Sequence, residues 1–113
     1  MNNCLFCKIA AGEIPSDKVY EDDKILGFRD IDPQAPVHVL LIPKDHITSA
    51  AVVNHDNSGV VAHIFEVIGL LVAELGLENG FRVVSNVGAQ GGQSVPHLHF
   101  HLLGGRDMTW PPG

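Results

Sequence analysis

The 113-residue sequence has few of the residues that mark several common classes of protein. It holds two cysteines, too few for a disulfide framework, and seven lysines and arginines against thirteen acidic residues, for a net charge of −6. A strongly basic footprint is therefore absent, and duplex nucleic acid and anionic membranes are poor candidate partners. An anionic ligand would need a local site that holds it against the overall charge.

Long hydrophobic runs are also scarce. The longest apolar stretch, residues 60–77, is interrupted by polar residues and glycines, which predicts that no transmembrane helix is present. Residues 1–8 lack the basic segment and apolar core of a secretory signal. The Cys4-Leu-Phe-Cys7 motif favours metal or redox chemistry over structural bridging. We therefore expect a protein of the reducing cytoplasm.

The composition and the local sequence patterns predict one α+β domain. Hydrophobic residues make up 45% of the chain and charged residues 18%, which excludes a disordered or fibrous chain. Local patterns predict a short helix over residues 5–11, strands over 19–21, 25–30, 38–42, 81–86 and 97–103, and one long helix from near Asp56 or Asn57 to Gly76. The apolar residues of the long helix recur at three- and four-residue intervals: Val60, Val61, Ile64, Phe65, Ile68, Leu71, Val72 and Leu75. We expect a mostly antiparallel sheet with the long helix on it.

Three of the seven histidines alternate with apolar residues in the run His97-Leu98-His99-Phe100-His101. A strand would point the apolar residues into the core and the three imidazoles to the opposite face. One interpretation is a metal site, although neighbours at this spacing lie about 7 Å apart and all three imidazoles converge poorly. A second is a polar, partly solvated face. A third is catalysis, with a neutral imidazole as nucleophile and its neighbours stabilising an oxyanion or protonating a leaving group.

The loop that precedes this run, residues 86–94, is rich in glycine. Backbone N–H groups unobstructed by side chains can form an anion-binding nest. The loop is not a Walker loop, because it lacks the Gly-Lys-Ser/Thr ending and no helix follows. An ordinary flexible hairpin loop is the alternative. Beside a face of histidines, we favour a phosphate cradle.

The run Gln93-Ser94-Val95-Pro96-His97-Leu98-His99-Phe100-His101-Leu102-Leu103 closely resembles the signature of the histidine triad (HIT) superfamily. Further segments are similar to the HINT branch of that superfamily: Glu13-Ile14-Pro15, Tyr20-Glu21-Asp22-Asp23, Phe28-Arg29-Asp30-Ile31, Pro33-Gln34-Ala35-Pro36, His38, Ile42-Pro43-Lys44, Gly104-Gly105-Arg106 and Trp110-Pro111-Pro112-Gly113. The resemblance spans nearly the whole chain. It implies a HIT-like fold with a single HIT domain over residues 1–113. It also implies a homodimer with joined sheets, in which the tail, residues 104–113, reaches toward the partner's site.

The function implied by the resemblance is hydrolysis of the phosphorus–nitrogen bond of purine nucleoside 5′-phosphoramidates through a covalent nucleotidyl-histidine. The implied ligand is a purine nucleoside monophosphate or phosphoramidate, and no cofactor is required for catalysis. Aminoacyl-adenylates are related substrates. Two alternatives stay open: a dinucleoside polyphosphate hydrolase, against which Ser94 and the Trp-Pro-Pro-Gly tail argue, and a nucleotide-binding or partner-binding protein with incidental catalysis.

The resemblance also implies roles for individual residues. His99 would be the nucleophile, and the carbonyl of His97 would accept from its Nδ1–H. His101 and His38 would contact the phosphoryl oxygens, and Ser94 would lie near the leaving amine. The phosphate path would be lined by Asn86, Gly92 and Gln93. The ribose would bind Asp30, and the purine would contact Leu5, Phe6, Ile9, Phe28 and Ile31. Core packing is the alternative for Phe6, Phe28 and Ile31, and a turn role is the alternative for Asp30.

A structural zinc site is a further expectation. Cys4 and Cys7 share one face of a helix and form half of a zinc site. By resemblance to HIT proteins with the same motif, His46 and His97 complete it. Two small core thiols, or a redox pair, are the alternatives.

Four other positions carry smaller expectations. We expect His55 and His63 to face solvent beside the long helix. Thr109 and Pro96 depart from the family pattern at the rim of the implied site, which leaves the preferred leaving group open.

Overall fold

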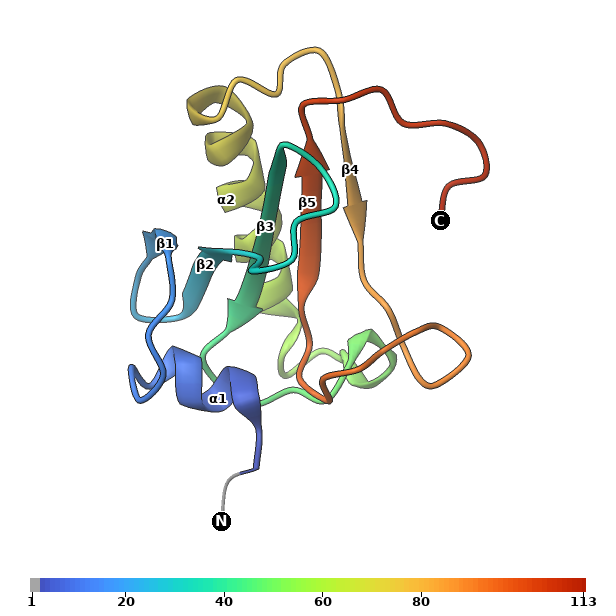
Figure 1. Cartoon of the computed structure of the whole chain (residues 1–113). Helices are drawn as coiled ribbons and strands as arrows, with labels where there is room; N and C mark the ends of the chain where they lie inside the picture. Colours follow the sequence, from blue (N-terminus) through green and yellow to red (C-terminus); the bar gives the residue numbers. More distant parts are fainter. Residues whose placement is uncertain (1–2) are drawn as a thin grey trace.

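A five-stranded antiparallel sheet forms the centre of the structure, a computed structural model that describes residues 3–113 (Figure 1). The strands are β1 (Lys18–Glu21), β2 (Ile25–Arg29), β3 (Val37–Pro43), β4 (Phe81–Val84) and β5 (Phe100–Gly104), in the spatial order β1-β2-β3-β5-β4. The helices are α1 (Leu5–Ala10), α2 (Ser58–Glu74) and a short 3-10 helix, Ala50–Val52. The predicted α+β fold is confirmed.

Two apolar clusters, one on each face of the sheet, hold the helices in place. Because side chains alternate along a strand, Val39 and Leu41 of β3 pack beneath α2, whereas Leu40 and Ile42 pack beneath α1. The cluster beneath α2 also contains Ile25, Ile64, Val67, Ile68, Leu71, Leu98, Phe100 and Leu102. The cluster beneath α1 also contains Cys4, Phe6, Ile9, Leu26 and Phe28. The short helix therefore covers the face of the sheet that α2 leaves open.

Two strands differ from their predicted bounds by two residues or more at one end. The strand expected over residues 97–103 begins only at Phe100. Pro43 would face the missing part and has no N–H to donate, and the Leu98 N–H donates instead to the carbonyl of Ile47 (2.6 Å). β4 ends at Val84, and beyond it the Ser85 hydroxyl donates to the carbonyl of His99 (2.9 Å). A side chain thus replaces the backbone ladder next to the histidine run.

The long helix follows the predicted pattern with two differences. Asn57 precedes its first residue, but the Asn57 Oδ1 accepts from the Asn54 N–H (2.7 Å) and makes no capping bond to α2. Phe65 was expected on the buried stripe; it is 49% exposed and packs edge-on against Phe100. The buried stripe is Ile64, Val67, Ile68 and Leu71. Within residues 3–113, no helix combines the length and the apolar character needed to span a membrane.

The expectation that His63 faces solvent is wrong, because this residue ties α2 to the turn between β1 and β2. Its Nε2 lies 2.6 Å from Oδ2 of Asp22. The hydrogen bond to Asp22 raises the pKa of His63. Burial opposes ionisation of Asp22, but hydrogen bonds from His63, the Lys24 N–H and Tyr20 hold the pKa of that carboxyl below its usual range. Both shifts favour the ion-paired state of this contact.

Candidate functional site

The three histidines of the run lie on the α1 side of the sheet, and the apolar residues between them pack beneath α2. The ring centroids of His99 and His101 are 5.1 Å apart, and Phe6 of α1 contacts both His97 and His99 edge-on. His97 is fully buried and His99 is 6% exposed. The interpretation as a solvated polar face is therefore wrong for these two residues.

The protonation of His99 follows from one hydrogen bond. Its Nδ1 lies 2.7 Å from the carbonyl oxygen of His97. A carbonyl only accepts, so Nδ1 carries the proton and Nε2 of the neutral ring keeps its lone pair. The same bond stabilises a positive charge on the ring if Nε2 becomes covalently substituted. The tautomer with its proton on Nδ1 and a lone pair on Nε2 is the one that a nucleophilic imidazole requires.

His38 of β3 and His101 of β5 lie side by side across the two strands. Their atoms Nε2 and Nδ1 are 2.9 Å apart, and Nδ1 of His38 accepts from the backbone N–H of Gln34 (3.0 Å). Both nitrogens of His38 therefore have protein partners. The expected direct contact of His38 with a phosphoryl oxygen does not fit this geometry, and of these two rings only His101 keeps a nitrogen for a ligand.

Burial keeps this pair of rings uncharged. Burial and the neighbouring His99 and His38 lower the pKa of His101 to about 4. Burial also lowers the pKa of His38, against the opposing effect of Asp30. Both imidazoles are therefore neutral at neutral pH, and each carries one ring proton.

Asp30, the expected ribose ligand, lies at the end of β2. Its Oδ1 accepts from the N–H of Asp32 (2.8 Å), which is the turn role considered as the alternative. Its Oδ2 is 3.4 Å from Nε2 of His38. Oδ2 of Asp30 therefore lies next to the histidine cluster, and the side chain is partly exposed. The turn role of Oδ1 does not exclude a ligand at Oδ2.

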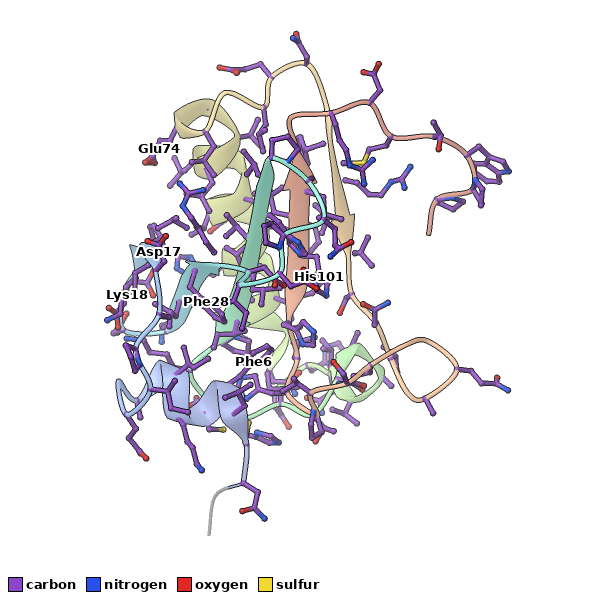
Figure 2. All side chains as sticks on the ribbon, in the orientation of Figure 1. Phe6, Asp17, Lys18, Phe28, Glu74 and His101 are labelled. Carbon is purple, nitrogen blue, oxygen red and sulfur yellow. The ribbon has the colours of Figure 1, made fainter. Side chains whose placement is uncertain are left out.

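Of the five residues expected to contact a purine, three are buried and two are exposed. Phe6 and Phe28 pack edge-to-face with centroids 5.7 Å apart, and Ile9 belongs to the same cluster. Figure 2 shows Phe6, Phe28 and His101 in front of the sheet, on the face away from α2. Leu5 is 44% exposed and Ile31 is fully exposed. Core packing therefore describes Phe6 and Phe28 but is wrong for Ile31.

The glycine-rich loop is braced from within. The N–H groups of Gly88, Gly92 and Gln93 donate to loop oxygens, and Nδ2 of Asn86 donates to the carbonyl of Gly91 (2.8 Å). A side chain at Gly91 would collide with the carbonyl of Val87. The expected open nest is wrong for these three N–H groups.

Two residues of the loop that were expected near the phosphate differ in exposure and in bonding. The Gln93 amide donates to the carbonyls of Thr48 and Val95, so Gln93 is a brace of the loop. Ser94 is exposed, and within residues 3–113 neither its N–H nor its hydroxyl donates to a protein atom. Ser94 is therefore the loop residue best able to donate to a ligand.

The four predicted metal ligands lie together. The donor atoms of Cys4, Cys7, His46 and His97 are all within 4.8 Å of one another. Nδ1 of His97 is 3.2 Å from Sγ of Cys4 and 3.4 Å from Sγ of Cys7, and Nδ1 of His46 is 3.2 Å from Sγ of Cys7. A tetrahedral zinc ion with these ligands has sulfur–nitrogen edges of about 3.5 Å.

The hydrogen bonding of His97 also fits a metal. Its Nε2 donates to the carbonyl of Pro43 (2.8 Å), which leaves the lone pair of Nδ1 directed at the thiols. Two thiols and two imidazoles are a donor set typical of structural zinc. The residues of this chain therefore fit that ion.

Comparison with known proteins identifies the family. A family model described as the HIT domain matches residues 11–108. The chain belongs to the HIT family. A crystal structure of a HIT family hydrolase from Legionella pneumophila Philadelphia 1 matches this HIT chain with a TM-score of 0.95 and 58% identity, covering 98% of this chain and 100% of that one.

Two curated relatives agree with the expected HINT branch and with the metal cluster. They are the Adenylylsulfatase HINT1 of Arabidopsis thaliana and the 14 kDa zinc-binding protein of Zea mays. Each is 50% identical over 111 residues, which cover 96% of this chain and, respectively, 76% and 87% of those proteins.

Proposed function

We propose that this HIT protein is a nucleotide hydrolase that cleaves the phosphorus–nitrogen bond of purine nucleoside 5′-phosphoramidates. The observation that carries the proposal is the hydrogen bond from His99 Nδ1 to the carbonyl of His97, which leaves Nε2 as a neutral nucleophile. The similar Legionella pneumophila protein is described as a HIT family hydrolase, which supports the reaction class. The name of the Arabidopsis thaliana relative supports an adenylyl substrate.

The reaction has two displacements. The Nε2 atom of His99 attacks the α-phosphorus, the phosphorus–nitrogen bond breaks, and the amine leaves with a proton passed from solvent through the Ser94 hydroxyl, which the water of the second step returns. Water then attacks the nucleotidyl-imidazole, breaks the new phosphorus–nitrogen bond, and releases the nucleoside monophosphate with His99 restored. The buried His97 carbonyl stabilises the cationic ring of the intermediate through the Nδ1–H bond.

The remaining site residues bind and orient the nucleotide. His101 donates to a phosphoryl oxygen from Nε2, and the Ser94 hydroxyl donates to the leaving group. Asp30 accepts from the ribose hydroxyls with its partly exposed Oδ2. The purine lies against the exposed apolar side chains of Leu5 and Ile31, backed by Phe6, Ile9 and Phe28. Asn86, Gly92 and Gln93 keep the loop in the shape that presents Ser94.

Zinc has a structural role in this proposal. Cys4, Cys7, His46 and His97 would hold one ion, which would fasten α1 to the segment before β5 and supply no reacting group. The zinc-binding name of the Zea mays relative supports the metal. Two reduced thiols as ligands also support a cytoplasmic location.

We also propose that the whole chain acts as one HIT domain in a homodimer. β4 is an edge strand, and an edge strand is a surface on which a second sheet can pair. Phe65, Leu70 and Phe81 are 49%, 58% and 44% exposed, which is apolar surface available for burial. The tail, residues 104–113, would reach toward the partner's site.

A second candidate substrate is adenylyl sulfate, favoured by the adenylylsulfatase name of the Arabidopsis thaliana relative. The same attack by His99 would break a phosphorus–oxygen bond and release sulfate. The amine and sulfate routes differ only in the group that faces Ser94.

Steady-state assays of the full-length protein test the proposal. We expect turnover of adenosine or guanosine 5′-phosphoramidate, and a loss of at least about 10³-fold in kcat/KM for His99→Ala. The exposed His55 supplies the control variant His55→Ala, which keeps wild-type turnover. Adenylyl sulfate and a diadenosine polyphosphate are assayed in parallel. If the protein turns over either compound faster than the phosphoramidate, that compound becomes the proposed substrate. Full activity of His99→Ala contradicts the proposal.

A further inference from the structure

The direction of the hydrogen bonds around His38 is fixed by a backbone amide. The N–H of Gln34 points to Nδ1 of His38 (3.0 Å). An amide N–H only donates, so Nδ1 of His38 is unprotonated and the proton of the neutral ring is on Nε2. That proton is donated to Nδ1 of His101 (2.9 Å), which places the proton of His101 on Nε2. One donor at residue 34 thus decides which nitrogen of His101 is protonated.

The alternative of a metal ion among these groups does not fit the bonding. Asp30, His38 and His101 offer ligand-type atoms within 4.8 Å of one another. An ion on Nε2 of His38 would require both nitrogens of that ring to be unprotonated, since Nδ1 already accepts from Gln34. At His97, by contrast, Nε2 donates to a carbonyl and Nδ1 is left for a metal. The ring nitrogens of His38 and His101 therefore carry protons, and this cluster is not a metal site.

Contacts from the segment after β5 fix the position of the Gln34 peptide. Nε of Arg106 donates to the carbonyl of Gln34 (3.1 Å). Gly105, with φ +87°, lies against Pro36, where a side chain would meet the proline ring at 3.0 Å. Gln34 therefore donates to His38 through the peptide group on its N-terminal side and accepts from Arg106 through the next one.

We propose that Arg106 is a positioning residue for the hydrolysis: by holding the Gln34 carbonyl, it keeps the Gln34 N–H on His38 and makes His101 present Nε2–H to the phosphoryl group. The proposal rests on the proposed function, because the nucleotide's phosphoryl oxygen is the acceptor. A His101 ring with its proton on Nδ1 would instead turn a lone pair toward an anionic oxygen. The neutral state of both rings, caused by burial, makes the choice of tautomer matter at neutral pH.

Two-bond hydrogen–nitrogen NMR correlations of the ring nitrogens, recorded on the full chain without substrate, test the tautomers directly. We expect His38 and His101 to be protonated on Nε2 in the wild type. In Arg106→Gln, His101 becomes a mixture of tautomers, and kcat/KM for the phosphoramidate falls about tenfold or more. Arg106→Lys keeps a cationic donor on a chain longer than that of glutamine, and restores part of the tautomer preference and of kcat/KM. Arg82→Gln removes a matched contact between an arginine and the carbonyl of Thr109 in the same segment, and leaves the His101 tautomer unchanged.

The second variant pair acts on the amide itself. Gln34→Pro removes the N–H and is expected to shift His101 as Arg106→Gln does, whereas Gln34→Ala keeps the N–H and the Nε2–H tautomer. If circular dichroism shows Gln34→Pro unfolded, Arg106→Gln decides the test. A wild-type His101 protonated on Nδ1, or an Arg106→Gln protein with an unchanged tautomer, overturns the inference. Failure of the proposed function is separate, because it is seen in the His99→Ala assay and leaves the substrate-free spectra unaffected.

Discussion

Neighbouring backbone groups assign one protonated nitrogen to His97, His99 and His38, and the His38 ring in turn assigns that of His101. The carbonyls of His97 and Pro43 accept from His99 and His97, and the N–H of Gln34 donates to His38. The proposed roles of His99 and of the metal ligands come from the sequence through its resemblance to the family, because the motif residues can be matched one by one. The Gln34 contact could not be predicted, because a backbone donor has no residue type that signals it.

The neutrality of His101 gives a prediction about pH. Burial lowers its pKa to about 4, below its ordinary value, so between pH 6.5 and 4 the unfolded chain binds more protons at this residue than the folded chain. The contribution of His101 to the free energy of unfolding therefore falls as the pH falls through that window. We expect an NMR titration of the His101 ring with a midpoint near pH 4. A midpoint at or above 6.5 would show a charged, solvated ring and refute the buried pair.

At the scale of elements, α1 links the metal cluster to the site. The helix carries Cys7, follows Cys4, and places Phe6 against His97 and His99. Local sequence character predicted this helix, whereas the metal ligands and the site residues around it were expected from the family resemblance. Local sequence character could not predict where β5 begins, because that depends on Pro43, a residue distant in the chain whose missing N–H ends the pairing.

Metal analysis of protein purified without chelator tests the link through α1. We expect one zinc per chain in the wild type and none in Cys7→Ala or His46→Ala, with His55→Ala as the matched control that keeps the ion. At free zinc 100-fold above Kd, the ion adds about 2.7 kcal/mol to the free energy of unfolding, and the two ligand variants lose this increment. Absence of zinc from the wild type argues for the alternative of two packed thiols, and its retention by His46→Ala removes His46 from the ligand set.

At the scale of the whole molecule, the two faces of the sheet have different roles. The face under α2 holds most of the core, and the face under α1 holds the histidines, the aromatic pair and the metal cluster. The alternation in the histidine run predicted this division for that strand, whereas residues 38–42 were predicted only as a buried strand. Exposure was less predictable: Ile31, in the loop after β2, and Phe65, on α2, are apolar, yet they lie at the surface.

The proposed function depends on Nε2 of His99 as the atom that attacks phosphorus. The stereochemical course at phosphorus tests this most directly, with a single configuration of adenosine 5′-phosphorothioamidate hydrolysed in isotopically labelled water. Two in-line displacements through a nucleotidyl-histidine predict net retention of configuration, whether or not the intermediate accumulates. Inversion would mean that water attacks the nucleotide in one step, and would contradict the central claim.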